Sequence, residues 1–297
     1  MRLNITSGDY FNNYIQTKEN GVFLAFNESM LTGPLDINIF SSEFIKLRAN
    51  YHNVAIPEYL LKLSDITKPN YINTFEEINL WFGEDTFCVI NMITMLAYLE
   101  QINYSGIVYY TRIDDYTNEI IKEKEVIKLG IFNNIYVTVI LHKSFLNTNF
   151  SFLNNTIINF LNLHNGLDVV SEYIKNNIVL DNNSLLINSL KISKNLGLSD
   201  VIIQKIIDRF KYEHYELYYN NELISKLTLN LSNNVITYKI IKKDDNILSF
   251  LNQDFITDLD SIPFIKSRIV NMNRFNQTMI NYPTDKYTIK KLPKDNL

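Results

Sequence analysis

Short apolar runs alternate with longer amphipathic segments over the first 110 residues of the chain. The runs have strand length, and they predict strands at Leu3–Thr6, Val22–Phe26, Glu77–Phe82 and Gly106–Thr111. The segments between them place apolar residues on one side of a helix, and they predict helices at about Tyr10–Ile15, Ser41–Tyr51 and Asp85–Gln101. Such alternation favours parallel strand pairing, right-handed crossovers and a sheet covered on both faces.

A further apolar run at Tyr136–Leu141 is interpreted as another strand of this sheet, beside a strand within Val126–Leu129. We therefore expect residues 1–142 to form a Rossmann-like α/β domain with a mostly parallel sheet and flanking helices.

The pattern changes after residue 142, where helical segments rich in Asn and Leu are separated by Asn-rich breaks. Alternating residues at Leu223–Leu231 and Val235–Ile241, on either side of a Ser-Asn-Asn turn, predict a hairpin. The lysine-bearing tail after Pro283 is expected to be irregular. Residues 143–297 are therefore expected to form a smaller, mainly helical α+β domain with a hairpin at about 223–241.

The composition of the chain limits the classes of partner that it is expected to bind. A net charge of −4 gives no broad electrostatic reason to bind nucleic acid or an anionic membrane. The single cysteine, Cys88, excludes an intramolecular disulfide and suits a cytoplasmic protein. No apolar run reaches the roughly 18 residues of a membrane span, and the first residues lack a signal-peptide pattern. The four histidines show no metal-ligand spacing, and the sequence identifies no cofactor.

Polar residues follow three of the predicted strands, at the point where each strand ends. They are Ser7-Gly8-Asp9, Asn27-Glu28 and Glu84-Asp85. Because ligands of open parallel sheets bind at the carboxyl ends of the strands, we expect these residues to border a binding site. Acids there can orient hydroxyl groups, hold a metal or relay protons. The alternative for Asp9 and Asp85 is that each caps a helix.

Arg48 adds a positive charge on the helix at Ser41–Tyr51, on the side that also carries Tyr51. Its planar guanidinium suits a carboxylate or a phosphate group. The alternative is that Arg48 pairs with Glu28 or Asp85 and fastens the helix to the sheet.

The remaining candidates have structural alternatives as well. Gly8 and Gly33 suit tight turns, and the chain has neither the G-x-G-x-x-G nor the Walker pattern that would indicate a phosphate-binding loop. Trp81 suits either the core or a stacking surface. Cys88 is interpreted as a buried thiol on a helix that is apolar almost all round and is therefore buried by other elements or by a partner.

At these residues the sequence resembles a bacterial family known only as domain of unknown function 1835. The resemblance rests on SGDYFNNYI, NESMLTGPL, FIKLRANY and LWFGEDTFCVINMITMLAYLEQ, in this order over roughly Leu3–Thr111. It implies that the residues typical of the family are Gly8, Asp9, Glu28, Gly33, Pro34, Arg48, Tyr51, Trp81 and Asp85. The family has no established activity. His164-Asn165-Gly166-Leu167 resembles the Asn-Gly-Leu of the helical region that usually follows.

Two hypotheses about function result. The first is that the chain binds a small anionic ligand, a nucleotide or another phosphorylated compound, at the carboxyl edge of the sheet, with phosphoryl transfer or hydrolysis as an accompanying activity. The sequence leaves open whether the protein is an enzyme. The candidate ligand-binding residues are Ser7, Gly8, Asp9, Glu28, Gly33, Arg48, Tyr51, Trp81 and Asp85.

The second hypothesis is a non-enzymatic regulator or adaptor, because Leu190–Phe210 resembles a helix-turn-helix with Gly197 at its turn. Its second helix would offer DNA a mixed face with Asp200, Lys205 and Arg209, which suits phosphates poorly. An ordinary helical hairpin is the structural alternative for this segment. A homodimer through apolar helices is a third hypothesis.

Overall fold

The computed structural model describes residues 1–114, 117, 119–219, 221–233, 235–241 and 287–292. They form two compact units. The first contains Met1–Val169 and Leu190–Ser199, and the second contains Val170–Ser189 and the described residues from Asp200 onward.

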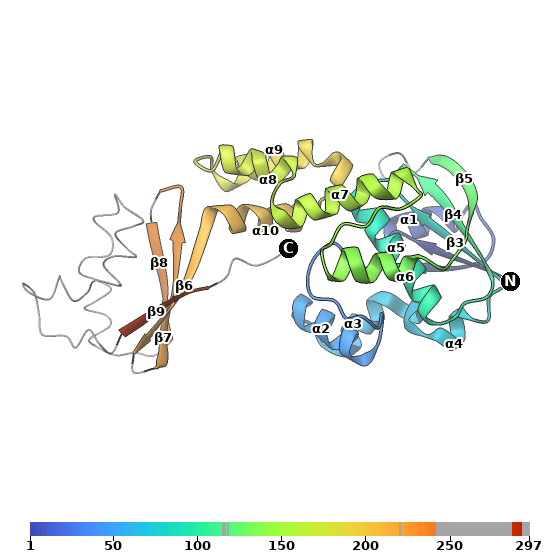
Figure 1. The fold of residues 1–297 in the computed structure, drawn as a ribbon, viewed down its shortest axis with the longest axis horizontal. Coiled ribbons are helices and arrows are strands. Elements are labelled where there is room, and N and C mark those ends of the chain that lie inside the picture. The colour runs from blue at the N-terminus through green and yellow to red at the C-terminus, as the bar shows by residue number, and fades with distance from the viewer. Residues whose placement is uncertain (115–116, 118, 220, 234, 242–286, 293–297) are drawn as a thin grey trace, which may run out of the picture. The chain divides into compact units, whose positions relative to one another are not determined.

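A five-stranded sheet lies at the centre of the first unit, as Figure 1 shows. Its strands, in spatial order, are β2 (Val22–Ala25), β1 (Arg2–Thr6), β3 (Glu77–Phe82), β4 (Ile107–Ile113) and β5 (Ile120–Ile127). The first four strands run parallel, and β5 pairs antiparallel with β4 at the edge. The predicted α/β fold with a mostly parallel, Rossmann-like sheet is therefore confirmed.

Helices connect the parallel strands. The connection from β1 to β2 is α1 (Asp9–Ile15), and the connection from β3 to β4 is α5 (Thr86–Gln101). Between β2 and β3 the chain forms α2 (Ser42–His52), α3 (Ile56–Leu63), η1 (Ser64–Thr67) and α4 (Pro69–Ile72). The chain moves outward from β1 to β2 and then crosses back over β1 to β3. The strand order therefore reverses between β1 and β3.

The two faces of the sheet bury different side chains. On one face Phe11 and Ile15 of α1 pack against Trp81 and Ile113. Neighbouring residues along a strand point to opposite faces, so Tyr110 lies on the other face, where its ring contacts Phe152. Helix α7 (Ser151–Asn165) carries Phe152 and belongs to the same unit.

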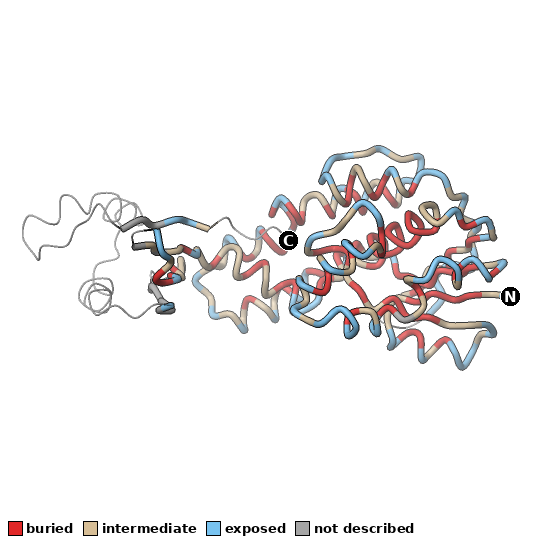
Figure 2. The backbone as a smooth tube through the Cα atoms, turned by 90° about the horizontal axis from the view of Figure 1, so that it is seen from below, coloured by how far each residue is buried: buried red, intermediate tan, exposed pale blue. Residues whose placement is uncertain are grey.

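Helix α5 is the most deeply buried helix of the first unit. Thirteen of its sixteen residues are buried, which explains why its sequence is apolar on every side. Figure 2 shows buried residues gathered along the central strands and helix. The expectation that other elements of the fold bury this helix is confirmed, since α6 (Phe132–Ile135) and α7 both contact it.

The predicted strand at Tyr136–Leu141 is wrong. These residues form a π-helical segment, η2, that continues α6. The buried residues of the combined segment recur at helical spacing, and they are Phe132, Ile135, Tyr136, Val139 and Ile140. The β-branched residues at 137–140 are typical of a strand, and they hide the helical spacing in the sequence.

The fifth strand lies earlier in the chain than the sequence predicted. It ends at Ile127 instead of beginning near Val126, and its central residues are charged and exposed. A strand that is solvated on both faces has no apolar run by which to recognise it.

Two polar residues at the end of α5 hold the neighbouring segments. The carboxylate of Glu100 accepts hydrogen bonds from the backbone N–H groups of Gly130 (2.6 Å), Phe132 (2.9 Å) and Asn133 (2.8 Å). It thereby satisfies donors at the amino end of α6 that have no partner within the helix. Gln101 accepts from the N–H of Ile39 at 2.9 Å.

The second unit combines helices with an antiparallel sheet. Its helical segments include α10 (Asp200–Lys211) and most of α8 (Val169–Asn176) and α9 (Asn182–Ile192). The strands lie in the order β8 (Val235–Ile240), β7 (Glu222–Asn230), β6 (Tyr212–Tyr219) and β9 (Tyr287–Lys291).

Two expectations about the second unit can be compared with this sheet. The predicted hairpin is confirmed, because β7 and β8 pair antiparallel from Asn230 and Val235 outward. The expectation of an irregular tail is wrong for Tyr287–Lys291, which pairs with β6. Lys291 forms an ion pair with Glu213 there, so a charged tail residue has a partner on the strand that it joins.

No described helix has the length and apolar character needed to cross a membrane.

Replacing Glu100 tests the capping role of its carboxylate. We expect Glu100→Ala to lower the free energy of unfolding by about 2 kcal/mol, because three backbone donors lose a charged acceptor. Urea unfolding followed by circular dichroism measures the change. Glu43→Ala, at an exposed position of α2, is the control and should change stability by less than about 0.5 kcal/mol. Equal losses in both variants would contradict the assignment.

Candidate functional site

The structure places the polar residues after β1, β2 and β3 at the same edge of the sheet, because these strands run parallel. A further acid, Asp114, follows the fourth parallel strand, β4, at this edge. The three predicted groups, which contain Ser7, Glu28 and Asp85, lie in different environments.

Glu28 and Arg48 form a buried ion pair. The Nη2 atom of Arg48 lies 2.6 Å from Oε1 of Glu28, and the two side chains are 0% and 2% exposed. Arg48 also donates to the carbonyl oxygens of Thr32 (2.6 Å) and Ser29 (2.8 Å). Nε2 of His52 lies 2.9 Å from the same Oε1. Of the two pairings that the sequence allowed for Arg48, the one with Glu28 is present.

The pair holds Glu28 in its charged form. Burial alone raises the pKa of this carboxyl, but the hydrogen bond with His52 and the charge and hydrogen bonds of Arg48 outweigh burial and lower the pKa to about 2. The same partner raises the pKa of Arg48 against the effect of burial. Both charges are therefore present at neutral pH, and each neutralises the other in the interior.

Gly33 and Tyr51 complete this cluster. Gly33 has a φ of +84°, and a Cβ atom on it would lie 2.6 Å from Nη1 of Arg48 and 2.7 Å from the ring of Tyr51. The Tyr51 hydroxyl lies 3.0 Å from Oγ1 of Thr32. The glycine, the arginine and the tyrosine thus occur together because the turn after β2 lies directly against the Arg48 side chain.

Ser7, Gly8 and Asp9 form the junction between β1 and α1. The Ser7 N–H donates to the carbonyl of Trp81 at 3.0 Å, and the Asp9 N–H donates to Oδ1 of Asn27 at 3.0 Å. Gly8 occupies the N-cap position with a φ of 90°. The Asp9 side chain is exposed in the first turn of α1, where a negative charge suits the helix dipole.

Trp81 is a core residue. Its side chain is buried, and its indole N–H donates to Oδ1 of Asn4 at 3.0 Å. Its ring centroid lies 6.1 Å from that of Phe11 on α1. Of the two roles considered for Trp81, the structure therefore shows the core role, with its polar N–H satisfied.

Asp85 caps α5, as one of the two interpretations of the sequence expected. Its Oδ1 accepts from the N–H of Cys88 at 2.7 Å. Gly197 lies so close that a Cβ atom on it would overlap the Asp85 carboxyl group. The hydroxyl of Thr86 donates to the carbonyl of Asn195 at 3.4 Å. The loop around residues 194–197 therefore lies against the amino end of α5.

A cavity of about 440 Å³ opens beside Asp85, at the carboxyl ends of β3 and β4. Three acids line it, Glu84, Asp85 and Asp114, together with one cation, Lys194. Its other polar side chains include Asn155, Asn159 and Asn195, and its aromatic ones are Tyr110 and Phe152. The lining therefore combines hydrogen-bond acceptors, amides and an aromatic wall.

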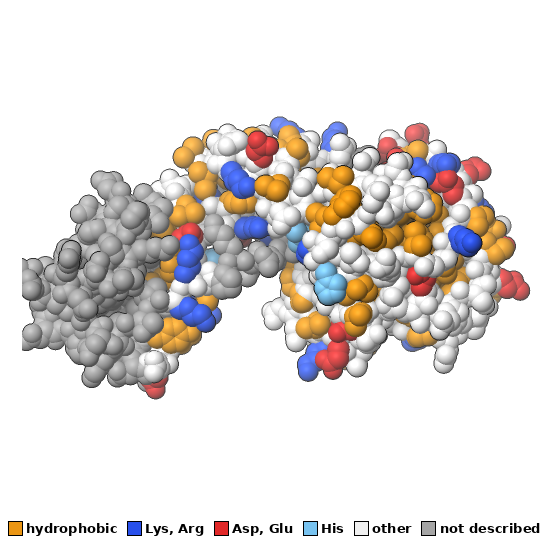
Figure 3. Space-filling view, viewed as in Figure 1, with side chains coloured by type: hydrophobic (Ala, Val, Ile, Leu, Met, Phe, Trp, Pro, Cys, Tyr) orange, Lys and Arg blue, Asp and Glu red, His pale blue; other side chains and the backbone are white. Residues whose placement is uncertain are grey.

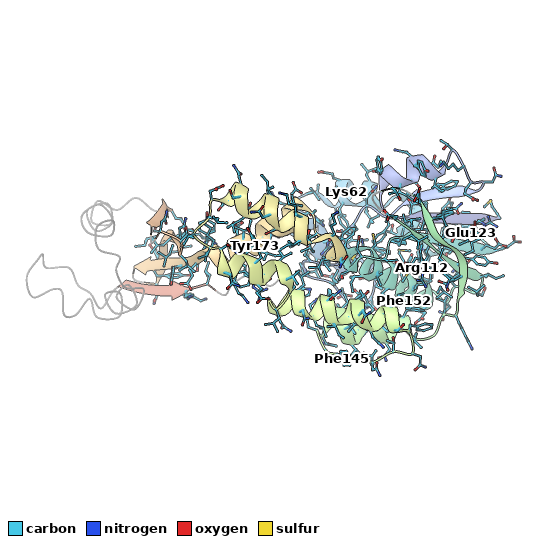
Figure 4. All side chains as sticks on the ribbon, turned by 90° about the horizontal axis from the view of Figure 1, so that it is seen from above. Lys62, Arg112, Glu123, Phe145, Phe152 and Tyr173 are labelled. Carbon is cyan, nitrogen blue, oxygen red and sulfur yellow. The ribbon has the colours of Figure 1, made fainter. Side chains whose placement is uncertain are left out.

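Arg112 connects this cavity to the edge strand. Its Nη1 lies 2.9 Å from Oε1 of Glu84, and its Nη2 lies 2.7 Å from Oε2 of Glu125 on β5. The guanidinium carbon lies 5.1 Å from the centre of the Phe152 ring, and Figure 4 shows these two side chains next to each other. Arg112 thus holds both Glu84 and the aromatic wall in place.

The predicted site residues are thus distributed over distinct environments. Glu28, Gly33, Arg48 and Tyr51 form the buried cluster, Trp81 lies in the core, and Asp85 lines the cavity. Sequence reasoning missed Asp114, Phe152 and Lys194 at the cavity. Asp114 could have been found, because it follows a predicted strand in the same way as the other acids. The other two come from segments far along the chain, and no local pattern marks them.

Comparisons with known proteins assign no family: no family model matches the chain, and neither the curated proteins nor the solved structures contain a match. The resemblance to the domain of unknown function 1835 family therefore stays a prediction.

Two further observations concern the alternatives. Among the described residues, no group of three or more His, Cys, Asp or Glu side chains is placed to hold a metal ion. In the helix-turn-helix-like segment, Gly197 has a φ of 63° after η3 (Lys194–Leu196), and α10 begins at Asp200. The boundary between the two compact units falls after Ser199, within this segment. Binding of DNA by residues 190–210 stays a prediction.

The pH dependence of stability tests the buried pair. The pKa of Glu28 is about 2 in the folded chain, below its ordinary value of 4.5, so the stabilisation is present above pH 4.5. It should be lost progressively as the pH falls from about 4.5 to about 2, by on the order of 3 kcal/mol. Urea unfolding at a series of pH values measures this loss.

The variant Glu28→Gln should lack that part of the pH dependence and lose about 3 to 5 kcal/mol at pH 7, because Arg48 is left buried without its counter-ion. If this variant does not fold, Glu28→Gln combined with Arg48→Met provides the same comparison without a buried charge. Identical pH profiles of the double variant and the parent chain would contradict the role of the pair.

Two glycines allow a matched test of the close contact at Gly33. Gly33→Ala should lower the free energy of unfolding by roughly 2 to 4 kcal/mol, because the new Cβ meets the Arg48 and Tyr51 side chains. Gly8→Ala is the control, since Gly8 has a similar φ of +90° but the nearest atom to a Cβ there lies at an ordinary contact distance of 3.7 Å. Its loss should be smaller, about 1 to 2 kcal/mol, because it contains the cost of the backbone conformation alone. Chemical denaturation of both variants makes the comparison, and equal losses would rule out the contact.

Proposed function

We propose that this chain binds a small phosphorylated molecule that carries hydroxyl groups, such as a nucleotide, in the cavity at the carboxyl ends of β3 and β4. The observation that carries the proposal is the lining of the cavity, where three carboxylates, one lysine and an aromatic wall surround about 440 Å³. That volume lies within the range of roughly 300 to 1,000 Å³ that is typical of small-molecule sites.

The acids define the polar part of the ligand. Glu84, Asp85 and Asp114 are acceptors, and carboxylates at the carboxyl edge of a parallel sheet are suited to ribose hydroxyl groups. Arg112 neutralises Glu84, but Asp85 and Asp114 still outnumber Lys194, so the lining is acidic and a purely anionic ligand would be repelled. A ligand with several hydroxyl or amino donors and a single phosphate group balances this lining better.

The aromatic, basic and amide side chains of the cavity define the rest of the ligand. Phe152 offers a partly buried ring on which a base or a sugar can stack, with the Arg112 guanidinium fixed next to it. Lys194 supplies the positive charge for a phosphate group. The Asn155 and Asn159 amides can donate to and accept from the edge of a base.

Arg48 does not enter this proposal as a ligand-binding group. Its guanidinium is fully buried and bound to Glu28 and to two carbonyl oxygens, so an anion would have to displace those partners. The sequence-based hypothesis of an anionic ligand is thus retained at the same edge, with Lys194 in the role first considered for Arg48. Phosphoryl transfer or hydrolysis remains a separate hypothesis, because no side chain of the cavity is assigned to a chemical step.

A binding screen with paired compounds tests the proposal. Each nucleoside 5′-monophosphate is compared with its nucleoside, and each sugar phosphate with its sugar, with and without Mg²⁺, by thermal shift and then by titration calorimetry. A ligand that binds only the folded state raises the melting temperature, and the stabilisation grows with the logarithm of the ligand concentration relative to the dissociation constant. We expect Phe152→Ala to weaken both members of a pair, and Lys194→Ala to weaken the phosphorylated member by about tenfold while sparing the other.

Lys191→Ala serves as the matched control, because Lys191 is exposed and lies three residues before Lys194 but does not line the cavity. Absence of stabilisation by every compound would overturn the proposal. So would a melting shift that survives both Phe152→Ala and Lys194→Ala.

A further inference from the structure

The edge strand β5 presents hydrophobic residues on an open edge. Ile120, Ile121 and Val126 are 43%, 51% and 68% exposed. The strand pairs only with β4 in the five-stranded sheet, so its other side carries a row of backbone N–H and C=O groups without a strand partner in that sheet. An open edge of this kind is a template for adding another strand.

The sequence of β5, IIKEKEVI, is complementary to itself in the reverse direction. Antiparallel pairing of two copies about a point between residues 123 and 124 opposes Lys122 to Glu125 and Glu123 to Lys124. Lys122 and Glu125 pair with Arg112 and Tyr110, which are two residues apart on β4, so both point to the same face of the sheet and can face each other across the axis. Each charge thus faces the opposite charge, and the aliphatic residues of β5 lie at the two ends of the paired segment.

Neighbouring registers do not have this property. A shift by one residue in either direction places Glu123 opposite a glutamate, because it then faces either itself or Glu125 of the other copy. It also places lysine opposite lysine, and like charges facing each other destabilise a strand pair. The charge pattern therefore selects one register.

We infer that β5 is the surface through which two copies of this chain pair, antiparallel and about a two-fold axis between Glu123 and Lys124. The interface is isologous, since the same strand serves both partners. Glu123 and Lys124 are exposed, and within the described residues neither forms an ion pair. Lys122 and Glu125 pair with each other in the single chain. Figure 3 shows acidic and basic side chains next to one another where Figure 1 labels β5.

β5 also has features that prevent an edge strand from pairing with another strand in other proteins. Its residues Glu123 and Lys124 lie opposite Thr111 alone, which is a bulge, and a second irregularity lies between the pairs Arg112–Lys122 and Ile113–Ile120. It also carries lysines. A bulge increases the twist of a strand, so the paired ribbon would be twisted. Lysines prevent edge pairing when nothing neutralises them, whereas here each lysine faces a glutamate of the second copy.

Charge reversal with rescue tests the register in the full chain. Sedimentation velocity and light scattering over a range of protein concentrations should show a dimer. Lys124→Glu should raise the dimer dissociation constant by about tenfold or more, because Glu123 then faces a glutamate on both sides of the axis, and Glu123→Lys should do the same with two lysines. The double variant Glu123→Lys with Lys124→Glu should restore the dissociation constant to within about threefold.

Lys46→Glu is the control, because it makes the same change of charge at an exposed position of α2 and should leave the dimer intact. Circular dichroism of each variant checks that the exposed substitutions preserve the fold. A parent chain that is monomeric at every concentration would overturn the proposal and assign the bulge and lysines to edge protection. Failure of the double variant to recover, or an equal loss in Lys46→Glu, would overturn it as well.

Discussion

The structure depends on one constraint: helix α5 is apolar on every side and must therefore be covered on every side. The sheet covers one side of it, and α6, η2 and α7 cover others. Its few polar residues then determine how the covering segments attach. Asp85 caps its first turn, Asn91 binds the turn after β2 through the carbonyl of Glu28 and the N–H of Met30, and Glu100 caps α6. One helix thus fixes the positions of the loops at both of its ends.

The turn after β2 illustrates how charge and backbone conformation are coupled. Arg48 supplies five donors from a buried position, and the turn provides carbonyl oxygens of Ser29 and Thr32 beside the Glu28 carboxylate. The chain can lie this close only because Gly33 lacks a side chain. Each residue is therefore explained by the others, without any ligand. A group of polar residues that a sequence marks as a candidate site can therefore form a structural unit as well as a binding site.

The sequence predicted the parallel strands well because each is buried on both faces and reads as a short apolar run. Glu77–Phe82 is predicted with its exact bounds, and the bounds of α1, α2 and α5 are predicted within one residue. The short helices α3, η1 and α4 between β2 and β3 are not predicted. The prediction failed at Tyr136–Leu141, where a β-branched run conceals a helical period, and at β5, whose charged residues give no apolar signal. The edge position of the acids followed from the parallel strands. Their separation into a buried cluster and an open cavity did not, since it depends on Arg48 and on α7, whose contacts cross long stretches of chain.

Arg112 connects the two proposals made for the first unit. One side of its guanidinium binds Glu84 at the cavity, and the other binds Glu125 on the edge strand. In the single chain Glu125 shares its charge between Arg112 and Lys122 of its own strand, and in the proposed dimer it would also face Lys122 of the second copy. Ile121 belongs to both the strand and the cavity lining. Strand pairing and occupation of the cavity would therefore both act on carboxylates bound to this arginine, and by linkage any effect of one on the affinity of the other would be reciprocal.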